Sequence, residues 1–343
     1  MKKNILISGG LGFIGSNFLK YILKKKHINC IVIDKLTYAS NIDILNKYKK
    51  YKNFKFYKID ICDNKKIEKL FSDIKFNHII NFAAESHVDN SIKNPNQFFK
   101  TNILGVINLA NAALEQWGYG SKKNGFLQIS TDEVYGDLKT LQSKGFDEKS
   151  MLLPNSPYSS SKASAELILR SYNKTYGMQI TITNCTNNFG PHQNNEKLIP
   201  VIINSLINGK KVPIYGNGKN IRDWIFVDDH CKIILKLLNN FNSLSKYNIG
   251  QNNEYSNLEL VNIIYKCIRE IMLKNKKLLK KYPKFNFELD FNNELINFIN
   301  DRLGHDFRYA IDSKLLNKKF NIKLKNSFLL NLKKTIKWYL NND

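Results

Sequence analysis

Two acidic residues, Asp132 and Glu133, stand just after the apolar run 125–129, which has the pattern of a buried strand. In open α/β sheets, ligands bind at the carboxyl ends of the strands. Two adjacent carboxyl groups placed there can act on one substrate as general acid and general base, if one is protonated and the other ionised. A lone Asp-Glu pair is more often a solvated loop pair, so the rest of the chain has to decide between the two interpretations.

Tyr158 and Lys162 form a second pair that can do chemistry. On a helix, residues four apart share one face. A nearby ammonium stabilises a phenolate and lowers the tyrosine pKa, so that the side chain can accept a proton from an alcohol. The Y-x-x-x-K spacing is common by chance, and it indicates a hydride-transfer site only when a cofactor site accompanies it.

A glycine-rich turn near the start of the chain predicts that cofactor site. A short apolar strand leads into Gly9, Gly12 and Gly15, and an apolar-periodic helix follows. Such a turn can approach a pyrophosphate closely, and the helix N-terminus faces the phosphates, although the spacing is G-x-x-G-x-x-G rather than G-x-G-x-x-G. The next apolar run ends at Asp34. This carboxylate can hydrogen-bond a ribose 2′-hydroxyl, which favours NAD over NADP; a helix cap or turn residue is the alternative.

Strands and helices alternate through the first half of the chain. Further strands are predicted at 54–61, 78–84 and 179–183, and long helices at 98–117 and 158–176. This alternation predicts an α/β fold with a doubly wound parallel Rossmann-type sheet and a smaller mixed α/β domain. The predicted domains are an NAD-binding domain at 1–185, to which the chain returns at about 223–250, and a substrate-binding domain at 186–222 and 251–343.

Composition limits the other classes of function. The net charge of +24 would suit a nucleic-acid-binding protein on an inert Rossmann scaffold, but only five of the 53 basic residues are Arg, and the lysines are dispersed. The five cysteines are scattered and lack a C-x-x-C pair, so neither a disulfide framework nor a metal site is expected. No apolar run reaches the length of a membrane span. A reducing cytoplasm fits these features.

The motifs together resemble the extended short-chain dehydrogenase/reductases and, within them, the nucleotide-sugar 4,6-dehydratases. The likeness covers nearly the whole chain, and its most specific part is the acidic pair after Thr131, which related epimerases usually lack. The segments that carry it are GGLGFIG at 9–15, DKLTYASN at 34–41, NFAAESHVD at 81–89, STDEVYG at 130–136, PNSPYSSSK at 154–162, NNFGP at 187–191, EKLIP at 196–200, PIYGNGKNIRDW at 213–224 and DRLGHDFRYAID at 301–312.

The resemblance implies a redox-neutral reaction on dTDP-glucose. Tyr158, assisted by Lys162, would take the C4 hydroxyl proton while hydride passes from C4 to NAD. Glu133 would remove the C5 proton, and Asp132 would protonate the departing C6 hydroxyl. Hydride return to C6 and reprotonation of C5 would give a 4-keto-6-deoxy sugar, with Thr131 hydrogen-bonded to the sugar O4. UDP-glucose as the substrate and a 4-epimerase activity are the alternatives.

The resemblance also implies two sets of binding residues. The cofactor set comprises Gly9, Gly12, Phe13, Ile14, Gly15, Asp34, Lys35, Leu36, Thr37, Asp60, Ile61, Phe82, Ala83, Ala84, Ser86, Thr101, Tyr158, Lys162 and Asn188. The substrate set comprises Ser86, Thr131, Asn187, Lys197, Leu198, Pro213, Tyr215, Arg222, Asn257, Arg302 and His305, with the arginines on the diphosphate. For the arginines, salt bridges within the protein are an equally weighted alternative.

Two further expectations follow from the resemblance. The helices at 98–117 and 158–176 would pair two subunits in a homodimer. Five positions depart from the family pattern, and the loss of arginine near the cofactor could weaken NAD retention, while Leu303 could loosen the diphosphate loop. The departures are Asn90 and Asn184 in place of Arg, Gln251 in place of Gly, Phe189 in place of Tyr and Leu303 in place of Pro.

Overall fold

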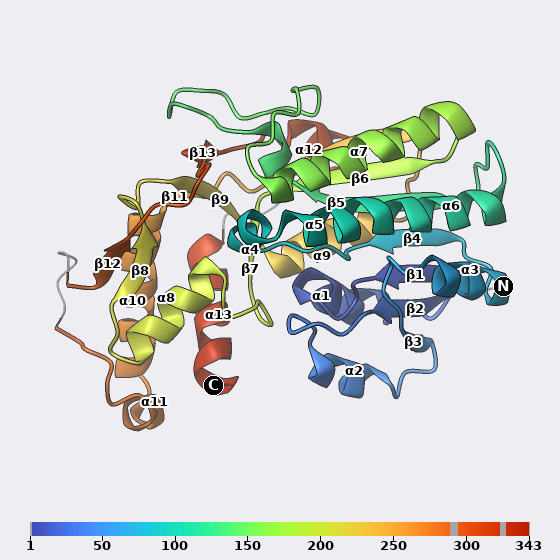
Figure 1. Ribbon diagram of the computed structural model, residues 1–343. Coiled ribbons are helices and arrows are strands. Elements are labelled where there is room, and N and C mark those ends of the chain that lie inside the picture. The colour runs from blue at the N-terminus through green and yellow to red at the C-terminus, as the bar shows by residue number, and fades with distance from the viewer. Residues whose placement is uncertain (1, 289–293, 323–326, 343) are drawn as a thin grey trace.

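The computed structural model describes residues 2–288, 294–322 and 327–342. Its main feature is a seven-stranded sheet with strand order β10-β6-β5-β4-β1-β2-β3 (Figure 1). All neighbouring strands in it are parallel. The order reverses between β1 and β4, which is the switch point where doubly wound sheets bind their ligands. The predicted Rossmann-type fold class is confirmed.

The strands of this sheet are β1 (Lys3–Ser8), β2 (Ile28–Asp34), β3 (Phe54–Lys58), β4 (His78–Asn81), β5 (Gly125–Thr131), β6 (Ile180–Cys185) and β10 (Leu244–Ile249). Two predicted strands are shorter than expected. β3 ends at Lys58 and β4 at Asn81, because the residues that follow leave the sheet to line a cavity at its edge.

Both faces of the sheet are buried, as the continuous apolar runs of its strands require. Alternate side chains of β1 point to opposite faces: Ile5 and Ile7 join one hydrophobic core, and Leu6 joins the other. The first core includes α1 (Phe13–Ile22), α2 (Ile42–Tyr48) and α9 (Val227–Leu237), and the second includes α3 (Asn64–Asp73), α6 (Gly105–Trp117) and α7 (Pro157–Tyr176).

The long helix predicted at 98–117 is interrupted. It consists of α5 (Pro95–Phe99), a π-helical turn at Lys100–Leu104 and α6, and it follows the short α4 (Val88–Lys93). Such wide turns are frequent at functional sites. Here the turn buries both Thr101 and Asn102, so that two consecutive polar side chains face the interior.

The remaining chain builds a smaller lobe beside the carboxyl end of the main sheet (Figure 1). Its core is formed mainly by four helices and the strands that they cover. These elements are β7 (Asn187–Phe189), α8 (Leu198–Ile207), β8 (Val212–Tyr215), β9 (Ile221–Phe226), β11 (Glu254–Ser256), α10 (Asn257–Leu273), α11 (Lys276–Lys281), β12 (Ile296–Ile299), β13 (Arg308–Tyr309) and α13 (Phe328–Asn342).

The strands of the smaller lobe form two small sheets. β9 pairs with β7, β11 and β13, whereas β8 pairs with β12. After β9 the chain returns to the main sheet through α9 and β10, and α12 (Lys314–Phe320) packs near β10. The domain boundaries given above stay a prediction; within the predicted second domain, 289–293, 323–326 and 343 lie outside the described residues.

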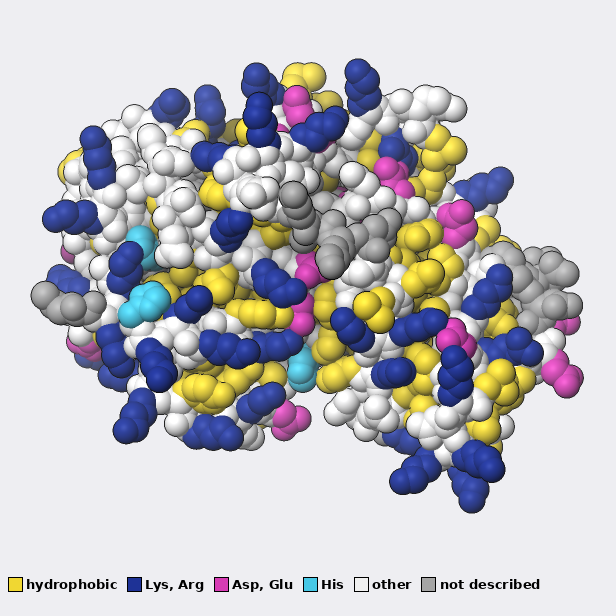
Figure 2. Space-filling model, turned by 180° about the vertical axis from the view of Figure 1, so that it is seen from behind, with side chains coloured by type: hydrophobic (Ala, Val, Ile, Leu, Met, Phe, Trp, Pro, Cys, Tyr) yellow, Lys and Arg dark blue, Asp and Glu magenta, His cyan; other side chains and the backbone are white. Residues whose placement is uncertain are grey.

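The positive charge is distributed over the molecule. Figure 2 shows lysines and arginines across the whole visible face, with acidic and apolar side chains between them. This pattern is typical of a solvated surface rather than of a nucleic-acid groove. Among the helices of the described residues, none is long and apolar enough to cross a membrane.

Candidate active site

The acidic pair lies at the carboxyl end of β5, as the sequence predicts. β5 ends at Thr131, and Asp132–Tyr135 form a single 3₁₀ turn whose first two residues are the acids. The Thr131 hydroxyl donates to Asp132 Oδ1 (3.2 Å) and accepts from the Glu133 main-chain N–H (3.3 Å). It also lies close enough to the Tyr158 side chain to lower the pKa of that phenol. One hydroxyl group therefore stands among three of the predicted catalytic residues.

The two carboxyl groups differ in environment. Asp132 is only 2 % exposed, and burial, followed by the neighbouring Glu133, raises its pKa well above the usual value. Its Oδ2 has no hydrogen-bond partner among the described residues. Burial also raises the pKa of Glu133, but Arg222, Lys197 and Arg302 act in the opposite direction. Asp132 is thus suited to carry a proton and Glu133 to accept one.

Tyr158 and Lys162 stand at the start of α7, which begins with a capping box of Ser156 and Ser159. The Lys162 ammonium donates to the Ile129 carbonyl oxygen (2.6 Å), and burial lowers its pKa to about 8. The sequence predicts that this ammonium lowers the Tyr158 pKa. In the structure the pKa of Tyr158 lies well above its usual value, because burial and the Glu133 carboxylate outweigh the Thr131 hydrogen bond.

A cavity of about 300 Å³ runs along the carboxyl edge of the sheet from the glycine turn to the catalytic residues. A dinucleotide fits the residues present. A Cβ on Gly9, whose φ is +67°, would lie 2.5 Å from the Ala83 nitrogen, so only glycine allows the turn to pack this closely. The N-terminus of α1 opens onto the cavity, which suits a pyrophosphate.

Asp34 is held in place at the end of β2. Its carboxylate accepts from the main-chain N–H groups of Leu11 (3.1 Å) and Leu36 (3.0 Å) and from the Ser40 hydroxyl (2.8 Å). The side chain lines the cavity, where a carboxylate can accept further hydrogen bonds from ribose hydroxyls. The helix-cap alternative does not apply, because the side chain that caps α2 belongs to Asn41, whereas the hydrogen bond from the Leu36 N–H is that of a turn residue.

The structure brings together nearly all residues of the predicted cofactor set. All line this cavity except Leu36, whose contribution is a main-chain turn with φ +61° that donates to Asp34. The lining residues that were not predicted include Tyr38, Ser40, Glu85 and Glu196. Tyr38 and Ser40 fall within the segment 34–41, and Glu85 follows β4, so their positions were a usable signal. Glu196 comes from a distant loop, and its signal was its place in the segment 196–200.

A second cavity of about 330 Å³ adjoins the first and lies against the smaller lobe. It is lined by every predicted substrate residue except Thr131, which lines the first cavity. Glu133, Ser86, Asn187, Glu196 and Lys197 line both cavities. The predicted base therefore stands where the two cavities meet.

The two predicted diphosphate-binding arginines already have partners. Arg302 makes a two-point ion pair with Asp89 of α4, with Nε 2.5 Å from Oδ1 and Nη2 3.1 Å from Oδ2. Tyr215 also donates to Asp89 (3.0 Å). Arg222 is buried and donates to the carbonyl oxygens of Ile221, Phe307 and Asp306. Both side chains border the cavity, so salt bridging and ligand binding are not exclusive.

His87 and His305 line the same cavity without a catalytic partner. His87 caps α4 by accepting from the Asn90 N–H (3.4 Å), and burial lowers its pKa. His305 contacts the Asp301 carboxylate (2.6 Å), and burial lowers its pKa as well. Neither histidine contacts the acidic pair by any hydrogen bond in the described residues.

The departures from the family pattern mostly have local partners. Asn184 donates to the Thr131 carbonyl (3.0 Å) and to Glu166 (2.7 Å), and it does not line either cavity. The positive charge next to Glu166 comes instead from Lys246 of β10 (3.0 Å). Asn90 is hydrogen-bonded to Tyr38 at the cavity rim. Phe189 is packed in the core of the smaller lobe, and Leu303 is exposed outside both cavities.

Among known proteins, a model of the family described as GDP-mannose 4,6 dehydratase matches residues 6–335. The chain belongs to this family. A dTDP-glucose 4,6-dehydratase of Haemophilus influenzae is 40% identical over 343 residues, covering 99% of this chain and 98% of the relative.

Solved structures agree with this assignment. The dTDP-glucose 4,6-dehydratase DesIV of Streptomyces venezuelae, solved with NAD bound, has a TM-score of 0.85 and 34% identity, and the match covers 99% of this chain and 97% of DesIV. A UDP-glucose 4-epimerase of Thermotoga maritima has a TM-score of 0.81 at 25% identity, covering 98% of this chain and 99% of the epimerase. The dehydratases and epimerases share one fold, and the residues of the site have to distinguish them.

Proposed function

We propose that this protein is an NAD-dependent dTDP-glucose 4,6-dehydratase, a hydro-lyase that converts dTDP-glucose to dTDP-4-keto-6-deoxyglucose and water. The observation that carries the proposal is the pair Asp132 and Glu133 at the end of β5, with one buried carboxyl group and one beside three cations. Oxidation at C4 alone needs no such pair. Elimination of water across C5 and C6 needs both a base and an acid.

Each catalytic side chain has one task in this reaction. Bound NAD would supply the acceptor and later the donor of hydride, and Gly9–Gly15 and Asp34 would hold it. Tyr158 would accept the proton of the C4 hydroxyl, and the buried Lys162 ammonium would favour the phenolate that this requires. Thr131, whose hydroxyl lies close enough to Tyr158 to lower its pKa, would orient the sugar O4.

Elimination would follow from the acidic pair. A keto group at C4 acidifies the hydrogen on C5, and Glu133 would accept that proton. Asp132, whose raised pKa favours its protonated form, would deliver its own proton to the C6 oxygen as water leaves. The enclosed position of Asp132 keeps solvent from supplying the proton instead.

The proposal is tested by separate incubation of the purified protein with dTDP-glucose and with UDP-glucose, followed by assay of the 4-keto-6-deoxy sugar. Turnover of dTDP-glucose is the expected result. Preferential turnover of UDP-glucose would move the assignment to the uridine nucleotide. Formation of a C4 epimer without loss of water would refute the dehydratase assignment.

The proposed assembly is a homodimer in the cytoplasm. Phe99, Leu104 and Leu167 are exposed apolar side chains on the helices at 95–104 and on α7, which supports a paired surface there. All five cysteines are free, which suits a reducing compartment. A monomeric mass by light scattering at micromolar concentration would disprove the dimer.

A further inference from the structure

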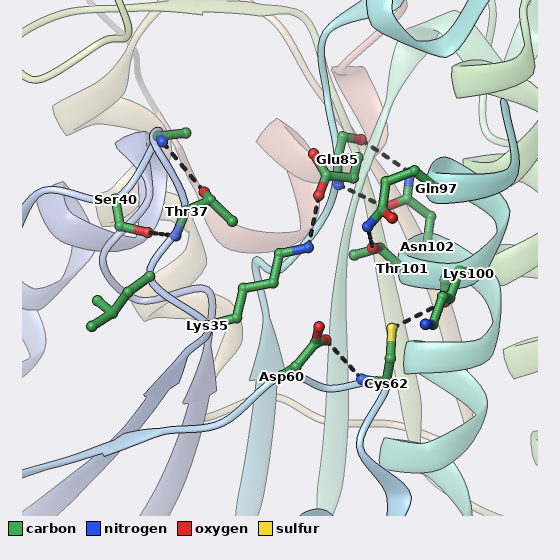
Figure 3. Close-up of polar contacts among 12 residues, drawn as sticks. Lys35, Thr37, Ser40, Asp60, Cys62, Glu85, Gln97, Lys100, Thr101 and Asn102 are labelled. Atoms are coloured by element: carbon green, nitrogen blue, oxygen red, sulfur yellow. Dashed lines mark hydrogen bonds and ion pairs between the residues drawn. The ribbon is translucent and has the colours of Figure 1, made fainter. Parts of the chain in front are cut away.

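Three loops at the rim of the cofactor cavity are connected by polar bridges between side chains. In the first bridge, Lys35 after β2 pairs with Glu85 after β4, with Nζ 2.8 Å from Oε1 (Figure 3). These strands flank β1 in the sheet. A bridge between their loops therefore crosses the carboxyl end of β1, where the glycine turn begins.

The other two bridges reach a loop of the chain far away in sequence. Lys197 donates to the Ser86 carbonyl oxygen (2.7 Å), next to Glu85. Tyr38 donates to the Glu196 carboxylate (3.1 Å), next to Lys197. Lys35 and Tyr38 belong to one turn, so the three bridges join the loops 35–38, 85–86 and 196–197 into a closed ring. All six of its residues line the cofactor cavity.

Both ends of the first bridge are held by main-chain contacts (Figure 3). The Glu85 N–H donates to Asn102 Oδ1 (2.9 Å), and the Glu85 carbonyl accepts from Asn102 Nδ2 (3.0 Å). On the other side, the Thr37 N–H donates to the Ser40 hydroxyl (3.0 Å). The side chains of Lys35 and Glu85 are 24% and 22% exposed, so this ion pair is partly shielded from solvent.

We infer that the ring formed by Lys35, Tyr38, Glu85, Ser86, Glu196 and Lys197 retains NAD in its cavity by closing the rim between the three loops. The inference rests on the proposed function, since a redox-neutral cycle requires the cofactor to stay bound from the oxidation at C4 until the hydride is returned to C6. It assigns a role in NAD retention to Glu85, Tyr38 and Glu196. Glu85 pairs with Lys35 and Tyr38 pairs with Glu196, so these side chains contact one another rather than the reacting atoms. Cutting one side of the ring opens the exit.

Exchange of NAD tests the ring without recourse to turnover. The protein is loaded with labelled NAD and diluted into excess unlabelled NAD, and loss of the label is followed by rapid filtration. Glu85→Gln and Tyr38→Phe should each accelerate the loss by about three- to tenfold, the range for one partly exposed charged contact. Tyr38 is 67% exposed, so the removal of its hydroxyl leaves the fold intact.

A double variant separates a ring from independent contacts with the cofactor. In Glu85→Gln/Tyr38→Phe the acceleration of NAD loss should be smaller than the product of the two single accelerations, since either cut opens the same exit. Accelerations that multiply would overturn the ring.

Lys274→Met supplies the matched control, because it removes an exposed ion pair with Glu270 (3.0 Å) on α10, outside both cavities. Its exchange rate should equal that of the native protein. Native-like rates in Glu85→Gln and Tyr38→Phe would also overturn the inference. A protein that binds no NAD at all would instead refute the proposed function, so the two failures are distinguishable.

Discussion

Replacement of the acidic pair should stop the loss of water while leaving oxidation at C4 intact. Asp132→Asn keeps the size of the side chain and the hydrogen bond from Thr131, but it removes the acidic proton that the carboxyl group would donate. Glu133→Gln likewise keeps the shape and removes the base. Since neither carboxyl group is required for the first proton transfer, which falls to Tyr158, both variants should still reduce bound NAD when dTDP-glucose is added.

The magnitude follows from the site. Asp132 is almost fully buried. In the described turn that follows β5, Glu133 is the only other carboxyl group. Water is therefore a poor substitute for Asp132 as the proton donor. Removal of this donor should lower kcat by roughly 100- to 10,000-fold, the range for general acid–base catalysis. At 1.36 kcal/mol per tenfold, this corresponds to about 2.7–5.4 kcal/mol in the barrier.

Rapid mixing with dTDP-glucose separates the two steps. The near-ultraviolet absorbance of NADH reports oxidation, and quenched samples report the 4-keto-6-deoxy product. Asp132→Asn and Glu133→Gln should accumulate NADH with little product, whereas Tyr158→Phe should form neither. If both acid variants formed product at nearly the native rate, the pair would not be the dehydration machinery, and an epimerase would explain the site better.

Three other predictions concern cofactor choice and stability. NADP should bind at least about tenfold more weakly than NAD, because its 2′-phosphate would be repelled by the Asp34 carboxylate and would replace the ribose hydroxyl that donates to it. Equal affinities in a binding titration would disprove this role of Asp34. Lys246→Met should lower the free energy of unfolding by about 2–3 kcal/mol, since it leaves the buried Glu166 carboxylate without its cation, although Lys246 itself is 20% exposed. Urea unfolding measures this free energy, and the double variant Glu166→Gln/Lys246→Met should recover part of the lost stability. A loss as small as that caused by the exposed Lys274→Met would contradict the prediction. Finally, the folded state raises the pKa of Asp132, so stability present below the unfolded pKa of about 3.9 is lost as pH rises through the folded value. Asp132→Asn avoids this loss, so its melting temperature should rise relative to that of the native protein as pH increases. A difference that does not change with pH would show that folding does not raise the pKa of Asp132.

The sequence predicts most of the fold because the strands are buried on both faces. Runs such as 4–8 and 125–129 are mainly apolar without alternation, and the turn at Gly9 has a backbone that only glycine allows. Acid–base residues also follow local rules, since the end of β5 and the first turn of α7 can be located from the chain. Local pattern thus predicts which residues reach the sheet edge.

Contacts between distant segments could not be predicted in this way. Asp89 and Arg302 are separated by 213 positions, and nothing near either residue indicates the other. The π-helical turn at 100–104 has an ordinary helical sequence and depends on packing of Asn102 against Glu85 and Ser161. Protonation states depend on burial, so the raised pKa of Tyr158 follows from the packed site and not from its spacing to Lys162.

The cations around Glu133 have a consequence for the timing of catalysis. In the free protein Arg222, Lys197 and Arg302 favour its charged form, and they therefore limit the rise in pKa that burial causes. A nucleoside diphosphate in the adjoining cavity would neutralise part of that positive charge. The affinity of Glu133 for a proton would then rise further when substrate is present. Binding of the nucleotide portion, remote from C5, would thereby strengthen the base, and a sugar that lacks the diphosphate would meet a less activated site even if it reached the same position.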